Sequence, residues 1–174
     1  MAKSRRRIKL PKGSIRFKTA DGSYALVTKP ASFVKAAKKA RRYGGSLAEI
    51  SSSAENADVF DAITGRLKPA RWAKSLAMDG GGSPYVWLGG SDAQAEGNWT
   101  WISSGEPIEL SRSEWGRGAM GQEPDNSGGS QHYLGLGLSN WPSGAADGEG
   151  FGNAGSWNDL DGSNKLFYLV ELNA

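Results

Sequence analysis

The sequence predicts an α+β domain in which two helices come early and an antiparallel sheet is completed late. Residues 32–67 carry two amphipathic helical patterns, whereas residues 85–172 change to short strand-like runs separated by long loops. The segment 116–162 holds 13 of the 25 glycines, so it is expected to form loops that shape a site. At 174 residues with 38% hydrophobic content, the chain is large enough for one packed core.

The N-terminal half predicts a hairpin followed by two helices. Two β-rich runs, 15–17 and 24–28, flank an Asp21-Gly22 turn signal. Ser32 then opens an amphipathic helix that Gly44-Gly45 ends. A second helix is expected to be capped by a serine within 51–53 with support from Glu55; its apolar positions are Ala57, Val59, Phe60, Ile63 and Leu67.

The C-terminal half predicts four short strands and two long loops. Residues 85–90, 99–101, 132–138 and 166–172 have strand-like patterns, and 132–138 alternates leucine with small residues on its other face. The loops are residues 103–129 and 139–155. Loops this long in a compact domain usually serve a function.

Composition excludes several classes of site. The chain has no cysteine, so disulfides, thiolate metal sites and cysteine nucleophiles are absent. The single His132 disfavours a histidine-based zinc site or a Ser-His-Asp triad. No apolar run approaches the roughly twenty residues of a membrane span, and the basic start lacks the apolar stretch of a signal peptide.

Charge is distributed very unevenly. Residues 1–42 carry 14 basic residues and one acid, whereas residues 43–174 carry 7 basic and 17 acidic residues. Residues 1–12 are interpreted as a basic tail or linker, with a nucleic-acid contact as the alternative, and residues 13–174 as the domain. The acidic, glycine-rich part favours a divalent cation and disfavours nucleic acid.

Two short stretches offer hard oxygen atoms for such a cation. Glu123-Pro124-Asp125-Asn126 places two carboxylates around a proline, and Trp157-Asn158-Asp159 adds an amide and a third carboxylate. Calcium takes roughly six to eight oxygen ligands of this kind. The sequence therefore predicts a calcium site at which the two stretches converge.

The ordered set of motifs resembles the C-type lectin-like domain, over nearly the whole span from Gly13 to Leu172. The matching stretches are Leu47-Ala48-Glu49-Ile50 with Ser52 and Glu55, Val86-Trp87-Leu88-Gly89-Gly90, Trp99-Thr100-Trp101, Glu123-Pro124-Asp125 and Trp157-Asn158-Asp159. The absence of cysteine resembles bacterial or phage members rather than the disulfide-braced ones.

The resemblance implies a double-loop fold in which calcium in the long loop binds two vicinal hydroxyls of a sugar. The implied calcium ligands are Glu123, Asp125, Gln131, Asn158 and Asp159. The proline between the first two is normally cis in this family, which aims both flanking side chains at one ion. Asn126 is counted with these residues as part of the expected sugar-binding surface.

Two positions depart from the family pattern. Asp125 replaces the usual asparagine of Glu-Pro-Asn sites, and Gln131 stands where members usually have an acid. The number of carboxylates is therefore unchanged, which supports a retained calcium site. Glu-Pro-Asp matches neither the mannose-type nor the galactose-type motif, so the sequence does not indicate which sugar is bound.

The insert at 139–155 contains Trp141 and Phe151, two aromatic residues close to the predicted site. Either ring is able to stack on the apolar face of a sugar, and both are counted here as ligand-binding residues. The alternative is that they pin the loop to the domain.

Three functions follow as hypotheses. The leading one is a calcium-dependent carbohydrate-binding module, placed outside the cell, on a cell surface or on a virion as part of a larger protein. The second is a protein-binding, adhesin or phage receptor-binding display domain on the same fold. A glycosidase with Glu123 and Asp159 as its acid/base pair is the third, and we expect no enzymatic activity because carboxylates gathered on a cation normally act as ligands.

Overall fold

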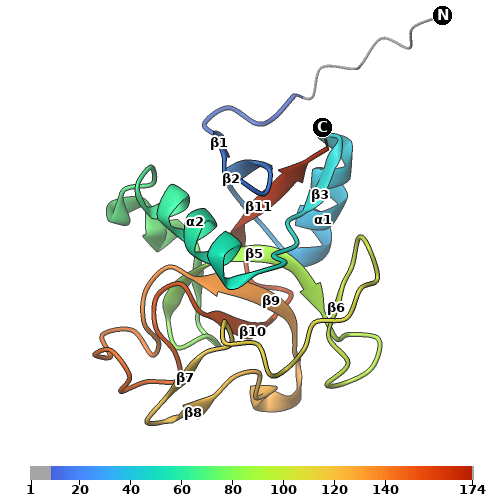
Figure 1. Ribbon diagram of the computed structural model, residues 1–174. Helices are drawn as coiled ribbons and strands as arrows, with labels where there is room; N and C mark the ends of the chain where they lie inside the picture. The colour runs from blue at the N-terminus through green and yellow to red at the C-terminus, as the bar shows by residue number, and fades with distance from the viewer. Residues whose placement is uncertain (1–8, 174) are drawn as a thin grey trace, which may run out of the picture.

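The computed structural model describes residues 9–173; the basic residues among 1–8 lie outside this range. The chain forms a mixed sheet with a helix on either side and a large loop region below it (Figure 1). The elements are β1 (Ile15–Lys18), β2 (Ser23–Ala31), α1 (Phe33–Arg42), β3 (Gly45–Leu47), α2 (Ser53–Thr64), the 3-10 helix η1 (Pro69–Lys74), β4 (Leu76–Ala77), β5 (Ser83–Ser91), β6 (Thr100–Trp101), β7 (Arg117–Gly118), β8 (Gly121–Gln122), the 3-10 helix η2 (Ser127–Gly129), β9 (Gln131–Gly137), β10 (Trp157–Asp161) and β11 (Leu166–Leu172).

The sheet joins the beginning and the end of the described chain. Its strand order is β1-β2-β11-β5-β9-β10, with β3 paired to β11 and β6 to β5. All neighbours are antiparallel except β11 and β5. The last strand therefore lies at the centre of the sheet, and β10 forms one edge.

The two faces of the sheet bury two separate clusters. Helix α2 contributes Val59 and Ile63 to the first cluster, which also holds Val86, Leu88 and Trp157. On the other face, α1 buries Phe33, Ala36 and Ala40 against a second cluster that includes Trp87 and Tyr168. Alternation along β5 and β11 sends neighbouring side chains to opposite faces, which is why both strands are buried throughout most of their length.

Local sequence signals account for most of these elements. The hairpin β1–β2 forms around Asp21-Gly22, and β11 spans residues 166–172 as predicted. Ser32 and Ser52 are the N-caps of α1 and α2, and the Ser52 hydroxyl accepts the Glu55 backbone N–H over 3.1 Å. The predicted α+β class is confirmed.

Two details differ from the sequence expectations. The Trp157-Asn158-Asp159 motif lies within strand β10, although no strand was predicted there. Leu10, assigned to the basic tail, is half-buried and packs against the second core cluster. No helix within residues 9–173 is long and apolar enough to cross a membrane.

Candidate calcium and ligand site

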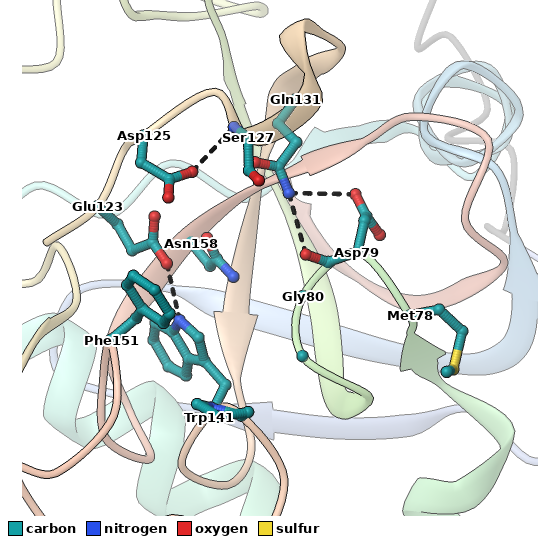
Figure 2. Close-up of a pocket in the computed structure, with 12 residues that line it drawn as sticks. Met78, Asp79, Gly80, Glu123, Asp125, Ser127, Gln131, Trp141, Phe151 and Asn158 are labelled. Atoms are coloured by element: carbon teal, nitrogen blue, oxygen red, sulfur yellow. Dashed lines mark hydrogen bonds between the residues drawn. The ribbon is translucent and has the colours of Figure 1, made fainter. Parts of the chain in front are cut away.

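Four of the five predicted calcium ligands line one cavity of about 230 Å³ beside the edge of the sheet. Glu123 and Asp125 come from the segment between β8 and η2, Gln131 begins β9, and Asn158 lies on β10. One carboxylate oxygen each from Glu123, Asp125 and Asp159 lies within 4.8 Å of the others. The structure therefore brings both predicted stretches to one point, as Figure 2 shows for the residues at the cavity.

One carboxylate oxygen of Glu123 accepts a hydrogen bond, and the other accepts none from the described residues. Its side chain is 6% exposed, and Oε1 accepts the indole N–H of Trp141 over 2.8 Å. Oε2 is buried without a hydrogen-bond partner among the described residues, and Figure 2 shows the oxygen not bonded to Trp141 on the side facing Asp125. Burial in this setting, together with the neighbouring carboxylates of Asp159 and Asp125, raises the pKa of Glu123.

Asp159 anchors the loop that carries Asp125. Its Oδ1 accepts the backbone N–H of Asp125 over 3.1 Å, and its Oδ2 accepts that of Asn126 over 2.7 Å. The side chain is fully buried, and burial raises its pKa although these two hydrogen bonds oppose the rise. The peptide bond between Glu123 and Pro124 is cis, as the resemblance led us to expect.

Asn158 and Gln131 each use the amide nitrogen for a protein contact. Asn158 Nδ2 donates to the hydroxyl of Tyr85 over 3.0 Å, and that hydroxyl donates to the carbonyl of Gly80. Gln131 Nε2 faces Asp79, and its Oε1 is buried without a partner among residues 9–173. Both amides therefore have the carbonyl end available for a cation.

Trp141 and Phe151 have different environments in the cavity wall. Trp141 is 2% exposed and packs against three glycines, at which an added Cβ would meet its ring at 2.2 to 2.7 Å: Gly116, Gly137 and Gly152. This packing pins the loop, which was one of the two roles considered for Trp141. Phe151 is half-buried and lines the cavity, so its ring keeps an accessible edge.

Asn126 does not line the cavity. Its backbone is left-handed (φ 46°), its Nδ2 donates to Glu96 over 2.7 Å, and its Oδ1 accepts the backbone N–H of Gln131 over 3.0 Å. Asn126 therefore braces the loop through both ends of its amide. Its contact with a bound ligand stays a prediction.

Sequence reasoning missed a second group of charged side chains behind the loop. His132 Nδ1 lies 3.1 Å from Asp92 Oδ1 and 3.4 Å from Glu96 Oε2. Asp92 is buried and also accepts the backbone N–H of Gly97. The group joins residues 92–97 to the start of β9, next to Gln131, and no motif in the sequence indicated that His132 would meet these acids.

Comparisons with known proteins identify the fold that carries this site. No protein-family model matches the chain. The mouse scavenger receptor C-type lectin carbohydrate-recognition domain superposes with a TM-score of 0.62 at 20% identity, covering 91% of this chain and 95% of that one. The lectin CEL-I from Cucumaria echinata gives a TM-score of 0.64 at 19% identity, covering 95% and 98%. The chain has the C-type lectin-like fold.

Two sequence relatives agree with this fold. Salivary C-type lectin 2 of Aedes albopictus is 29% identical over 113 residues, which is 65% of this chain and 64% of that protein. A perlucin-like protein of Mytilus galloprovincialis is 34% identical over 92 residues, or 53% and 47%. The match thus spans about half to two thirds of each relative. Within this fold, the cavity lies where the loop region meets strands β9 and β10.

Proposed function

We propose that this C-type lectin-like domain binds carbohydrate through a calcium ion held by Glu123, Asp125, Gln131, Asn158 and Asp159. The observation that carries the proposal is a pair of buried, unpartnered oxygens, Glu123 Oε2 and Gln131 Oε1, beside three converging carboxylates. Buried acceptors without donors are rare because they lose their hydrogen bonds to water. A cation would satisfy both.

The donor set fits calcium chemically. All five side chains offer hard oxygens, and the three carboxylates carry enough negative charge to neutralise a divalent ion. Five protein side chains leave coordination positions for two hydroxyls of a sugar, since calcium takes about six to eight ligands. Burial is the main cause of the raised pKa values of Glu123 and Asp159, and neighbouring carboxylates add to it; the positive charge of the ion would offset both effects.

The cavity next to the oxygens has an apolar wall suited to one face of a sugar. Met78, Pro142 and Phe151 line it together with the buried ring of Trp141. The C–H face of a pyranose packs well on such side chains. The solved structures with this fold include a scavenger receptor carbohydrate-recognition domain, which supports a glycan as the ligand here.

Binding is the whole of the proposed activity. One relative is a C-type lectin by name, and C-type lectins are a non-enzymatic carbohydrate-binding family. The proposal includes an extracellular location, which is supported by a relative whose name describes it as salivary.

Calcium binding is tested first and glycan binding second. Addition of CaCl2 should raise the melting temperature of the chelated protein, and Asp159→Ala should abolish calcium binding in calorimetry. A glycan array with and without calcium then identifies the sugar. An unchanged melting temperature and no heat of binding would show that the five residues hold no calcium.

A protein ligand is the second candidate, favoured by apolar side chains on the surface near the loops. Met78 is 78% exposed at the rim of the cavity, and Met120, between β7 and β8, is 55% exposed. On this reading, Asp125→Ala would leave partner binding intact, whereas Met120→Ser would weaken it. Loss of binding in Asp125→Ala but not in Met120→Ser supports the carbohydrate reading, because Met120 does not line the cavity.

A further inference from the structure

The amide of Gln131 is held in one orientation by a residue from outside both motifs. We propose that Asp79 is a positioning residue that turns the Gln131 amide oxygen toward the cation. This inference rests on the proposed calcium site and adds a residue to its support. Asp79 lies between β4 and β5, 52 residues before Gln131 in the chain.

The contacts define which end of the amide faces the cation. Gln131 Nε2 donates to the backbone carbonyl of Asp79 over 3.2 Å and to its carboxylate Oδ2 over 3.3 Å. Both partners are pure acceptors, so only the NH2 end of the amide is able to face them. Figure 2 shows these two contacts on the side of Gln131 toward Asp79. Gln131 Oε1 is consequently turned away from Asp79.

Asp79 is itself fixed, which makes it able to set this orientation. Its Oδ2 also accepts the backbone N–H of Asp161 over 2.7 Å, and its Oδ1 accepts Asn164 Nδ2 over 2.6 Å. Asp161 ends β10, and Asn164 follows in the connection to β11. The carboxylate of Asp79 is therefore tied to the end of the same strand that supplies Asn158 and Asp159.

A purely structural role for the Gln131 amide does not explain why its oxygen lacks a hydrogen-bond donor. Gln131 is 2% exposed, and its Oε1 has no hydrogen-bond partner in the described part of the chain. A brace that served stability alone would gain from a donor at that oxygen. A cation ligand, by contrast, requires an oxygen free of donors. A carboxylate at position 131 would not need orientation, because it has an oxygen at either end.

The difference between an amide and a carboxylate provides the test. We measure calcium affinity by titration calorimetry with CaCl2 for Asp79→Ala, Gln131→Glu and the double variant. Asp161→Asn is the matched control, because it removes a neighbouring carboxylate charge and its side chain accepts a hydrogen bond from the backbone of Ser163 rather than from Gln131. The melting temperature of each chelated protein shows that it is folded before calcium is added.

We expect Asp79→Ala to weaken calcium binding about tenfold when position 131 is Gln, which corresponds to about 1.4 kcal/mol. With Glu at position 131, the same change should weaken binding no more than Asp161→Asn does, which we put at about twofold. An equal weakening in both backgrounds would mean that Asp79 acts through its charge alone and overturns the inference. So would the absence of any effect.

A replacement variant and the wild-type measurement distinguish failure of the calcium site from failure of the role of Asp79. If Gln131→Glu does not fold, Gln131→Met replaces it, since without an amide Asp79→Ala should have no effect beyond that of the control. If the wild-type protein itself binds no calcium, the proposed function fails. A wild type that binds calcium but shows no coupling between positions 79 and 131 disproves only the role of Asp79.

Discussion

The indole nitrogen of Trp141 donates to Glu123 Oε1 over 2.8 Å, and both side chains are almost fully buried. The two residues lie in different long loops, 18 residues apart. This hydrogen bond occupies one carboxylate oxygen of Glu123, so that only the other is left for a cation. The loop at 139–155 thereby fixes the orientation of Glu123, a proposed calcium ligand in the preceding loop.

Replacing this donor should weaken calcium binding without removing the ring. Trp141→Phe loses the N–H but retains most of the packing, so we expect calcium affinity to fall about tenfold and stability by about 1–3 kcal/mol. Calorimetry and urea unfolding measure the two effects. Trp72→Phe is the matched control, because its indole N–H donates to the Leu67 carbonyl remote from the cavity. Equal calcium affinities in the two variants would contradict this role of Trp141.

The calcium-free protein should lose stability as the pH rises. Burial raises the pKa of Glu123 and of Asp159, so the folded state holds a proton more tightly than the unfolded chain does. This contribution is complete below about pH 4, near the ordinary carboxyl pKa values, and is lost as the pH rises through the raised folded-state pKa values of about 6 for Asp159 and about 8 for Glu123. Each proton involved contributes a slope of up to about 1.4 kcal/mol per pH unit.

Unfolding by urea at several pH values, in chelator, measures this slope. Calcium requires the ionised carboxylates, so its affinity should increase over the same range. Glu123→Gln should flatten the pH dependence and, near neutral pH, stabilise the calcium-free protein by about 1 kcal/mol because the buried side chain at position 123 no longer ionises. A slope of the opposite sign in the wild type would show that the two carboxyls are not buried in this way.

Phe151 offers a direct comparison of sugar and ion binding. Because it lines the cavity and has no bond to a proposed calcium ligand, Phe151→Ala should leave calcium affinity within about twofold. Loss of ring stacking should weaken binding of the sugar found by the array by about 0.5–1.5 kcal/mol. The two affinities are measured by calorimetry, the second in saturating calcium. If calcium affinity fell as well, Phe151 would be pinning the loop rather than contacting the sugar.

N-terminal truncations test where the domain begins. Removal of residues 1–8 gives the reference protein, which retains every described residue from 9 onward. Removal of residues 1–12 also deletes Leu10, which packs on the core, and the Pro11 carbonyl, which accepts the Ser14 hydroxyl. We expect the longer truncation to cost about 1 kcal/mol or more, seen by calorimetric melting. Equal stabilities would place the domain boundary at Gly13, as the sequence suggested.

The sequence predicted those parts of the fold that depend on local signals. Asp21-Gly22 defines a hairpin, and Ser52 with Glu55 defines a helix start, because these residues act on backbone atoms within a few positions. The convergence of Glu123, Asp125 and Asp159 was predicted from an ordered set of motifs rather than from any single one. The sequence did not predict the side-chain contacts between distant loops.

Asp79 and Trp141 are two residues whose contacts could not be predicted from the sequence. Asp79 precedes three glycines and belongs to none of the motifs singled out in the sequence, yet it bonds Gln131, Asp161 and Asn164. Trp141 was expected either to stack on sugar or to pin its loop, and only tertiary packing shows its N–H directed at Glu123. Both roles depend on the direction of one side chain, which neither periodicity nor charge determines.

The position of β10 at the edge of the sheet affects how the protein behaves in solution. The segments that carry the loop cover this edge: Trp157 exchanges backbone hydrogen bonds with Glu114 and Gly116, and Asp159 binds the backbone of Asp125 and Asn126. An uncovered edge strand is a template for pairing with another chain. Calcium that holds this loop in place would therefore also protect the protein from self-association, and its removal would favour aggregation before global unfolding.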